Sequence, residues 1–148
     1  EIMLKIENNK IYIIMYHYVR EVKKSIYPNL KALELNNFIS QINFLKKKFN
    51  ILDYSDFIEI LNSKKIPKKP SILLTFDDGY LDHYKNVFPI LSKKRISGVF
   101  YTPIITFKKN KVLDVNKIHF ILEKENNREK IINFIDVNLR RYLKKNLI

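Results

Sequence analysis

One stretch constrains this chain more than any other, because an apolar run at residues 71–76 ends in two adjacent acids and a glycine. A short apolar run bounded by turn residues is typical of a buried strand. Strand interiors disfavour aspartate, so we expect Asp77 and Asp78 where the strand opens into a loop. Gly79 permits the crowded or positive-φ backbone of such a corner. Adjacent carboxylates repel each other unless a cation or a shared proton intervenes. A pair at the end of a strand therefore favours a catalytic or metal-binding role over a purely structural one.

The pattern around this strand predicts an α/β fold. Alternating strands and helices are typical of parallel strands joined by helical crossovers. Functional residues should then collect at the carboxyl ends of the strands, which here carry His17, the acid pair and Tyr101–Thr102. The expected strands are 11–17, 51–52, 72–76 and 96–102, and the expected helices are 33–49, a short one capped by Ser55, and 82–94.

The helices carry more detailed expectations. Asn36 or Asn37 is expected to cap the helix at 33–49, and Pro89 to kink or break the helix at 82–94. Residues 20–28 read as a charged loop. Beyond residue 116 the spacing predicts two or three helices without an intervening strand. The side chains expected to be buried in the short helix are Phe57, Ile58 and Leu61, and those in the later one are Tyr84, Val87, Phe88 and Leu91.

Composition limits the class of protein. The chain has 148 residues, 46% of them hydrophobic, which is enough for one domain with a substantial core. It has no cysteine, so disulfides and thiolate metal sites are excluded. No apolar run approaches the roughly 20 residues of a membrane span, and no signal peptide is visible. The compartment stays open, with a slight preference for the cytoplasm.

The net charge of +13 is the one composition feature that suggests a partner. Such a charge can indicate nucleic acid, anionic lipid or an acidic glycan. The lysines are spread along the whole chain, however, in a background rich in isoleucine and asparagine, so a solvated lysine coat is favoured. We therefore expect no nucleic-acid partner, and the oligomeric state is left open.

Residues 75–79, Thr-Phe-Asp-Asp-Gly, match the first motif of the polysaccharide deacetylases with a NodB-homology domain, carbohydrate esterase family 4. The flanking segments Tyr16-His17, 86–91 and 98–101 resemble the branch that acts on poly-N-acetylglucosamine. The resemblance covers residues 11–103. It implies the N-terminal part of a deformed (β/α) barrel, followed here by a helical segment at 114–148, within one incomplete domain spanning 1–148.

The resemblance also implies an activity, which is metal-dependent removal of N-acetyl groups from an amino-sugar polysaccharide. Asp77 would be the general base and Asp78 a ligand of a divalent metal ion, with zinc expected. A bound ion polarises the acetyl carbonyl, lowers the pKa of its water and offsets the repulsion between the acids. His17 and Tyr80 would contact the N-acetylated glycan at the mouth of the barrel.

The histidines depart from the family pattern. The family's second motif is a His-Ser/Thr-x-x-His pair that supplies the other two ligands, whereas His17, His83 and His119 show no such spacing. His83 is expected at the surface and His119 in structural packing. Two explanations stay open, a chain cut before the second motif, which is favoured, or a complete but degenerate protein. The alternatives to an active enzyme are an inactive glycan-binding module and a basic polyanion-binding protein.

Overall fold

The computed structural model describes residue 7, residues 9–64 and residues 67–146. The chain divides into two compact units, Glu1–Lys111 and Val112–Ile148. The first holds β1 (Ile11–Tyr16), β2 (Val19–Arg20), β3 (Leu33–Glu34), α1 (Leu35–Lys48), β4 (Asn50–Ile51), α2 (Tyr54–Ser63), β5 (Ser71–Phe76), α3 (Phe88–Lys94), β6 (Val99–Phe100) and α4 (Ile104–Lys109). The second holds α5 (Asp114–Lys124) and α6 (Arg128–Asn146).

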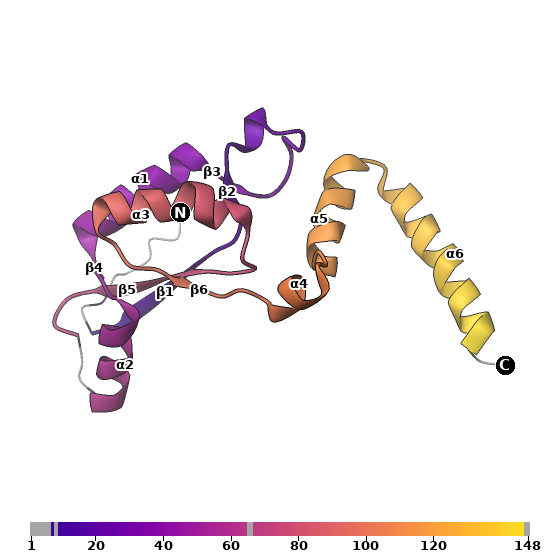
Figure 1. Cartoon of the computed structure of the whole chain (residues 1–148). Coiled ribbons are helices and arrows are strands. Elements are labelled where there is room, and N and C mark those ends of the chain that lie inside the picture. The colour runs from indigo at the N-terminus through magenta and orange to yellow at the C-terminus, as the bar shows by residue number, and fades with distance from the viewer. Residues whose placement is uncertain (1–6, 8, 65–66, 147–148) are drawn as a thin grey trace. The chain divides into compact units, whose positions relative to one another are not determined.

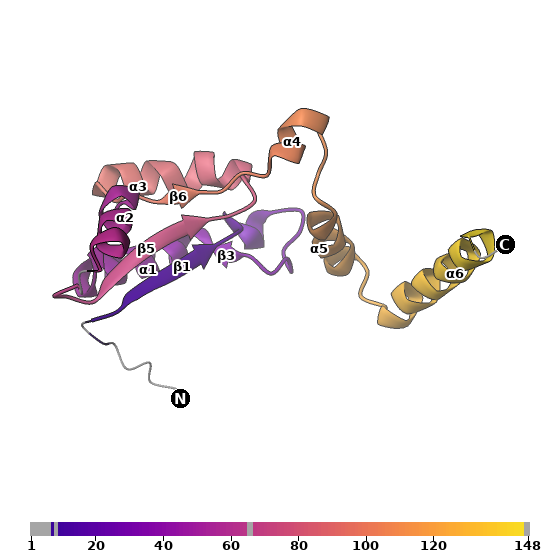
Figure 2. The ribbon, with the colours of Figure 1, turned by 90° about the horizontal axis from the view of Figure 1, so that it is seen from below.

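A parallel sheet with β5 at its centre organises the first unit, which confirms the predicted α/β class. β1 pairs with all six residues of β5, in a register that runs from Ile11 opposite Ser71 to Tyr16 opposite Phe76. The other edge of β5 is shared, because β4 pairs with its first two residues and β6 with its last two. Figures 1 and 2 show β1 and β5 side by side.

The hydrophobic core lies between one face of this sheet and two helices, α1 and α3, which cover that face (Figure 1). Every residue of β5 is buried, as its continuous apolar sequence requires. Phe38 of α1 and Phe76 of β5 are completely buried and meet edge to face, with ring centroids 6.1 Å apart. Burial of one such side chain contributes roughly 1.5–3 kcal/mol, so these aromatic contacts anchor the helix to the sheet.

The segment between β1 and α1 is more ordered than the predicted charged loop. β2 and β3 pair in parallel as a separate two-stranded sheet, and a 3-10 helix covers Val22–Lys24. Because β3 takes Leu33 and Glu34, α1 begins at Leu35 and not at residue 33. The prediction of Asn36 or Asn37 as N-cap was wrong, since Glu34 holds that position with an extended backbone. Its carboxylate accepts a hydrogen bond from the Val22 N–H at 3.0 Å.

The short helix α2 is capped two residues earlier than predicted. Asp53 and not Ser55 is its N-cap, and the Asp53 side chain accepts a hydrogen bond from the Asp56 N–H at 2.8 Å. The predicted burial is only partial, because Phe57 and Ile58 are half-buried and Leu61 is 54% exposed. None of the described residues of α2 is fully buried, so this helix contributes little to the core.

The helix predicted at 82–94 contains a π-helix at His83–Val87 directly before α3. Proline lacks an N–H, and its ring clashes with the carbonyl four residues back in a regular helix, so a wider turn before Pro89 accommodates it. The changed turn leaves Val87 and Leu91 buried as predicted, but the predicted burial of Tyr84 and Phe88 was wrong. Both of those side chains are more than half exposed.

The remaining elements follow the sequence more closely. β6 covers only Val99–Phe100, which is shorter than the predicted 96–102, and it pairs with the last two residues of β5. Beyond residue 103 the described chain forms helices without a strand, as predicted. Within the described ranges, every helix is too short or too polar to cross a bilayer.

Two phenylalanines of α1 provide a matched test of this core. Phe38→Ala should lower the free energy of unfolding by about 3–5 kcal/mol, because it removes a completely buried ring and leaves a cavity. Phe44→Ala should change it by less than about 1 kcal/mol, since that ring is 53% exposed. Urea denaturation followed by circular dichroism measures both, and equal losses would contradict the assigned core.

Candidate functional site

The carboxyl ends of three strands meet at the acid pair. The Asp77 N–H donates to the Tyr16 carbonyl at 2.9 Å, which extends the pairing of β5 with β1 by one residue. On the other side, the Tyr101 N–H donates to the Phe76 carbonyl at 2.8 Å. The sequence predicted that the carboxyl ends of these strands lie together, and the backbone pairing of β1, β5 and β6 confirms it.

Asp77 is half-buried and carries an unpartnered oxygen. Its Oδ1 atom is fully buried, and the described residues offer it no hydrogen-bond donor. A carboxylate oxygen removed from water without a donor costs about 1–3 kcal/mol or more. His83 Nδ1 is the other buried side-chain atom without a partner among the described residues. Unpartnered atoms of this kind are few in native proteins, and at Asp77 Oδ1 the described chain leaves a hydrogen-bonding position incomplete.

Asp78 and Gly79 form a tight left-handed corner. Their φ angles are 73° and 62°, and this conformation is uncommon for a residue other than glycine. A Cβ atom on Gly79 would collide with the Thr102 side chain, so glycine is required both by its φ and by the space. The corner therefore packs the acid pair closely against the chain that follows β6.

Tyr80 lies directly against the second acid. Its hydroxyl donates a hydrogen bond to Asp78 Oδ2 at 2.5 Å, and its ring stacks on Tyr18 with centroids 4.2 Å apart. Burial raises the pKa of the Tyr80 phenol above its ordinary value, and the hydrogen bonds with Asp78 and Tyr18 raise it further. The expected contact of Tyr80 with substrate stays a prediction, whereas its contact with Asp78 is an observation that the sequence did not suggest.

Of the two histidines near the site, His17 is exposed and His83 is buried, and the contact of His17 with substrate stays a prediction. His17 lies at the end of β1 with an exposed side chain, and its carbonyl accepts a hydrogen bond from His83 Nε2–H at 2.8 Å. The expectation that His83 is a surface residue was wrong, because only 4% of it is exposed. Its four-residue spacing from Val87 and Leu91, both buried, was the signal that could have placed it inside. Desolvation lowers the pKa of His83.

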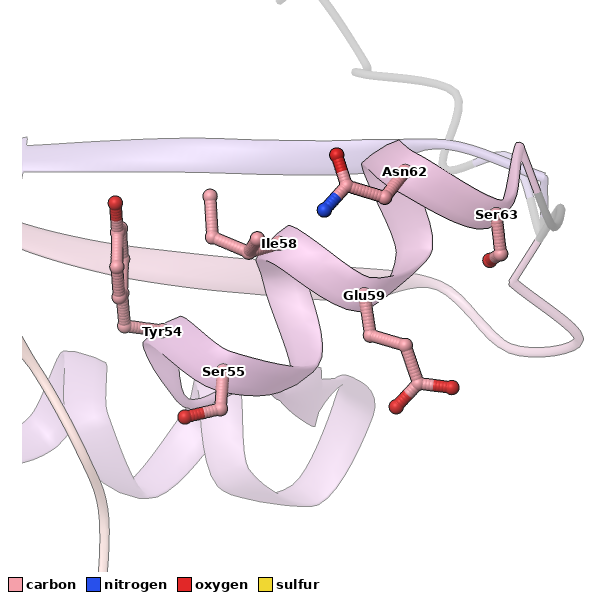
Figure 3. A pocket seen from close by; sticks show the side chains of 6 residues that line it. All are labelled: Tyr54, Ser55, Ile58, Glu59, Asn62 and Ser63. Carbon is pink, nitrogen blue, oxygen red and sulfur yellow. The ribbon is translucent and has the colours of Figure 1, made fainter.

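Several hollows lie on the described surface of the first unit. A cavity of 260 Å³ adjoins the corner, lined by Gly79, Tyr80, His83, Tyr84, Phe88, Phe100 and Thr102. A wider hollow of 720 Å³ runs along α2, and Figure 3 shows the side chains that line it. All of the lining residues in Figure 3 come from α2, and Glu59 is the one acid among them. The first hollow is therefore the one that shares residues with the candidate site.

The described residues do not by themselves fit a metal ion. No group of three histidine, cysteine, aspartate or glutamate side chains within the described ranges is placed to hold one. A catalytic zinc site generally needs three protein ligands. Near the corner, Asp77 and Asp78 are available, but His83 Nε2 is already bonded to the His17 carbonyl. The acid pair is thus at most part of a metal site, and His119 of α5 belongs to the other unit.

Comparisons with known proteins agree on one type of domain. The family profile "Polysaccharide deacetylase" matches residues 64–117, which include the acid pair. The chain is 30% identical over 98 residues to YxkH of Bacillus subtilis, an inferred polysaccharide deacetylase. That match covers 62% of this chain and 31% of the relative, so the chain spans about a third of the relative's length.

Solved structures give the same result. The chain is similar to a de-N-acetylase of Aggregatibacter actinomycetemcomitans, with 27% identity and a TM-score of 0.53 over 62% of this chain and 37% of that one. It shares its fold with the Streptococcus pyogenes deacetylase PplD, solved in complex with acetate, with 23% identity and a TM-score of 0.58. The second match covers 76% of this chain and 51% of PplD.

The buried imidazole makes stability depend on pH. Because the pKa of His83 is lower in the folded chain than the unfolded value of about 6.5, the unfolded chain binds more protons in mild acid. Stability should be complete above pH ~6.5 and fall below it, by at most about 1.4 kcal/mol per pH unit. Urea unfolding between pH 7.5 and 5.5 should show a smaller loss in His83→Gln than in the wild type. Equal losses would contradict the buried neutral imidazole.

Proposed function

We propose that the chain carries part of a polysaccharide deacetylase domain and that this part supplies the acid pair of a hydrolase that removes N-acetyl groups from an amino-sugar glycan. The reaction breaks a carbon–nitrogen amide bond and releases acetate and an amine. We further propose that the parallel sheet around β5 is the first part of a deformed (β/α) barrel, with the acid pair at the mouth formed by the strand ends.

The observation that carries this proposal is the unpartnered buried oxygen of Asp77. As general base, Asp77 accepts a proton from the water that attacks the acetyl carbon. No described donor occupies its Oδ1 atom, so that oxygen is not committed to a structural hydrogen bond, and the residue as a whole is only half-buried. The backbone hydrogen bond from its own N–H to Tyr16 fixes its place at the strand end. Two adjacent acids in this corner can serve different roles because their backbones differ, with only Asp78 left-handed.

Asp78 is proposed as one ligand of a divalent metal ion, with zinc expected. Its Oδ2 atom accepts the Tyr80 hydrogen bond, and ligating carboxylates are commonly oriented by such a second partner. The described cluster does not provide the further ligands, so this part of the chain alone should not bind zinc tightly. His17 and Tyr80 are proposed to contact the sugar because both lie beside the acid pair at the strand ends.

The experiment measures acetate released from N-acetylglucosamine oligomers by the protein expressed from the complete reading frame that contains this chain. Asp77→Asn should reduce the rate about 10²–10⁴-fold, because it removes the general base and keeps the shape of the side chain. Asp136→Asn is the matched control, since Asp136 lies on α6 in an exposed ion pair with Arg140. No acetate from the wild type, or an unchanged rate in Asp77→Asn, would overturn the proposal.

A glycan-binding role without catalysis is the second candidate. It is favoured by the missing three-ligand group among the described residues. In that case the 148-residue chain should bind an N-acetylglucosamine oligomer in calorimetry with a chelator present, with no loss of affinity in Asp77→Asn. Absence of binding under these conditions would remove this candidate.

A further inference from the structure

Three side chains of the helix that follows the acid pair hold the backbone segment that follows β1. We call Asp82, His83 and Asn86 the helix clamp. All three contacts join residues more than 60 positions apart in the chain, so they are tertiary and not local. They are Arg20 Nε to Asp82 Oδ2 at 2.7 Å, His83 Nε2 to the His17 carbonyl at 2.8 Å, and Asn86 Nδ2 to the Val19 carbonyl at 2.8 Å.

The clamp lies at an irregular point of the helix. His83 and Asn86 belong to the π-helix, and short π segments are frequent at functional sites. The Arg20–Asp82 pair is well shielded, because 24% and 13% of the two side chains are exposed. Loss of one partner from such a pair leaves a poorly solvated charge, so the pair specifies one geometry. By contrast, the ion pair between Lys24 and Glu21 is solvent-exposed, with 76% and 53% of the two side chains accessible.

The segment held by the clamp presents Tyr18. This side chain is buried, and the Arg20 guanidinium lies over its ring, 5.0 Å from the centroid. The Tyr18 ring also stacks on the Tyr80 ring, and the two rings are 27° from parallel. The His83 ring adds an edge-on contact to Tyr80 with centroids 5.5 Å apart. Tyr80 is therefore confined by side chains that the clamp holds in place.

The last contact reaches the acid pair, because the Tyr80 hydroxyl donates to Asp78 Oδ2. Asp78 has a left-handed backbone, and the Tyr80 hydroxyl is a hydrogen-bond partner that can hold its carboxylate in one orientation. Contacts run without a gap from Asp82 through Arg20, Tyr18 and Tyr80 to Asp78. The path joins the end of β1 to the end of β5 through side chains alone.

We propose that Tyr80 is a positioning residue that fixes the carboxylate of Asp78, and that the Arg20–Asp82 pair acts on Asp78 through Tyr18 and Tyr80. This inference rests on the proposed function, because a fixed Asp78 carboxylate aids activity only if Asp78 binds the metal ion as proposed. It assigns to the phenol of Tyr80 a partner within the protein, in addition to the sugar contact proposed above. The geometry itself is testable without any catalytic activity.

The test is the side-chain rotamer of Asp78, measured in the ¹³C,¹⁵N-labelled 148-residue chain from three-bond couplings between the backbone and Asp78 Cγ. The wild type should show one rotamer. Tyr80→Phe keeps the stack but loses the hydrogen bond, so the couplings should average over several rotamers. Arg20→Met should give the same averaging, because Tyr18 loses the cation that holds it. Lys24→Met is the matched control and should keep the single rotamer, since its ion pair is exposed.

Each outcome decides one part of the proposal. A single Asp78 rotamer in folded Tyr80→Phe, or averaged couplings already in the wild type, would overturn the role of Tyr80. A single rotamer in folded Arg20→Met would overturn the role of the ion pair. Dispersed amide spectra establish folding, and Tyr80→Phe decides the matter if Arg20→Met does not fold. Acetate release is measured separately, so failure of the proposed activity does not affect this result.

Discussion

The structure of the site depends on the parallel pairing of β5 with its neighbours. β1 occupies one edge of β5 along its whole length, and β6 occupies the last two residues of the other edge. The backbone hydrogen bonds from Asp77 to Tyr16 and from Tyr101 to Phe76 continue this pairing past the strand ends. The main-chain hydrogen bonds therefore position the acid pair. The packing of the buried face of β5 against α1 and α3 keeps the strand in place.

The same sheet explains why the two acids differ. Asp77 still belongs to the extended pairing, so its side chain is drawn toward the interior and one oxygen loses its access to water. Asp78 lies on the left-handed corner, where the chain must turn against Thr102. Identical residues thus meet different environments one position apart. This separation fits the two roles proposed for the pair, a general base at Asp77 and a metal ligand at Asp78.

Much of this architecture could be predicted from the sequence, because strongly apolar runs and glycine corners specify local structure. The strands β1 and β5, the corner at Gly79 and the helices at the carboxyl-terminal end all followed from such patterns. The burial of His83 and the clamp could not, since they depend on a π-helix before Pro89 and on contacts between distant residues. Both caps were misplaced, because β3 ends at Glu34, which caps α1, and because Asp53 caps α2 two residues before Ser55.

The central claim is that Asp77 activates water for attack on an N-acetyl group. The most direct measurement is mass analysis of the acetate released from an N-acetylglucosamine oligomer in H₂¹⁸O by the protein from the complete reading frame. The account predicts acetate that carries one ¹⁸O atom, with release abolished or reduced at least about 100-fold in Asp77→Asn. No acetate from the wild type, or undiminished release by the variant, would contradict it.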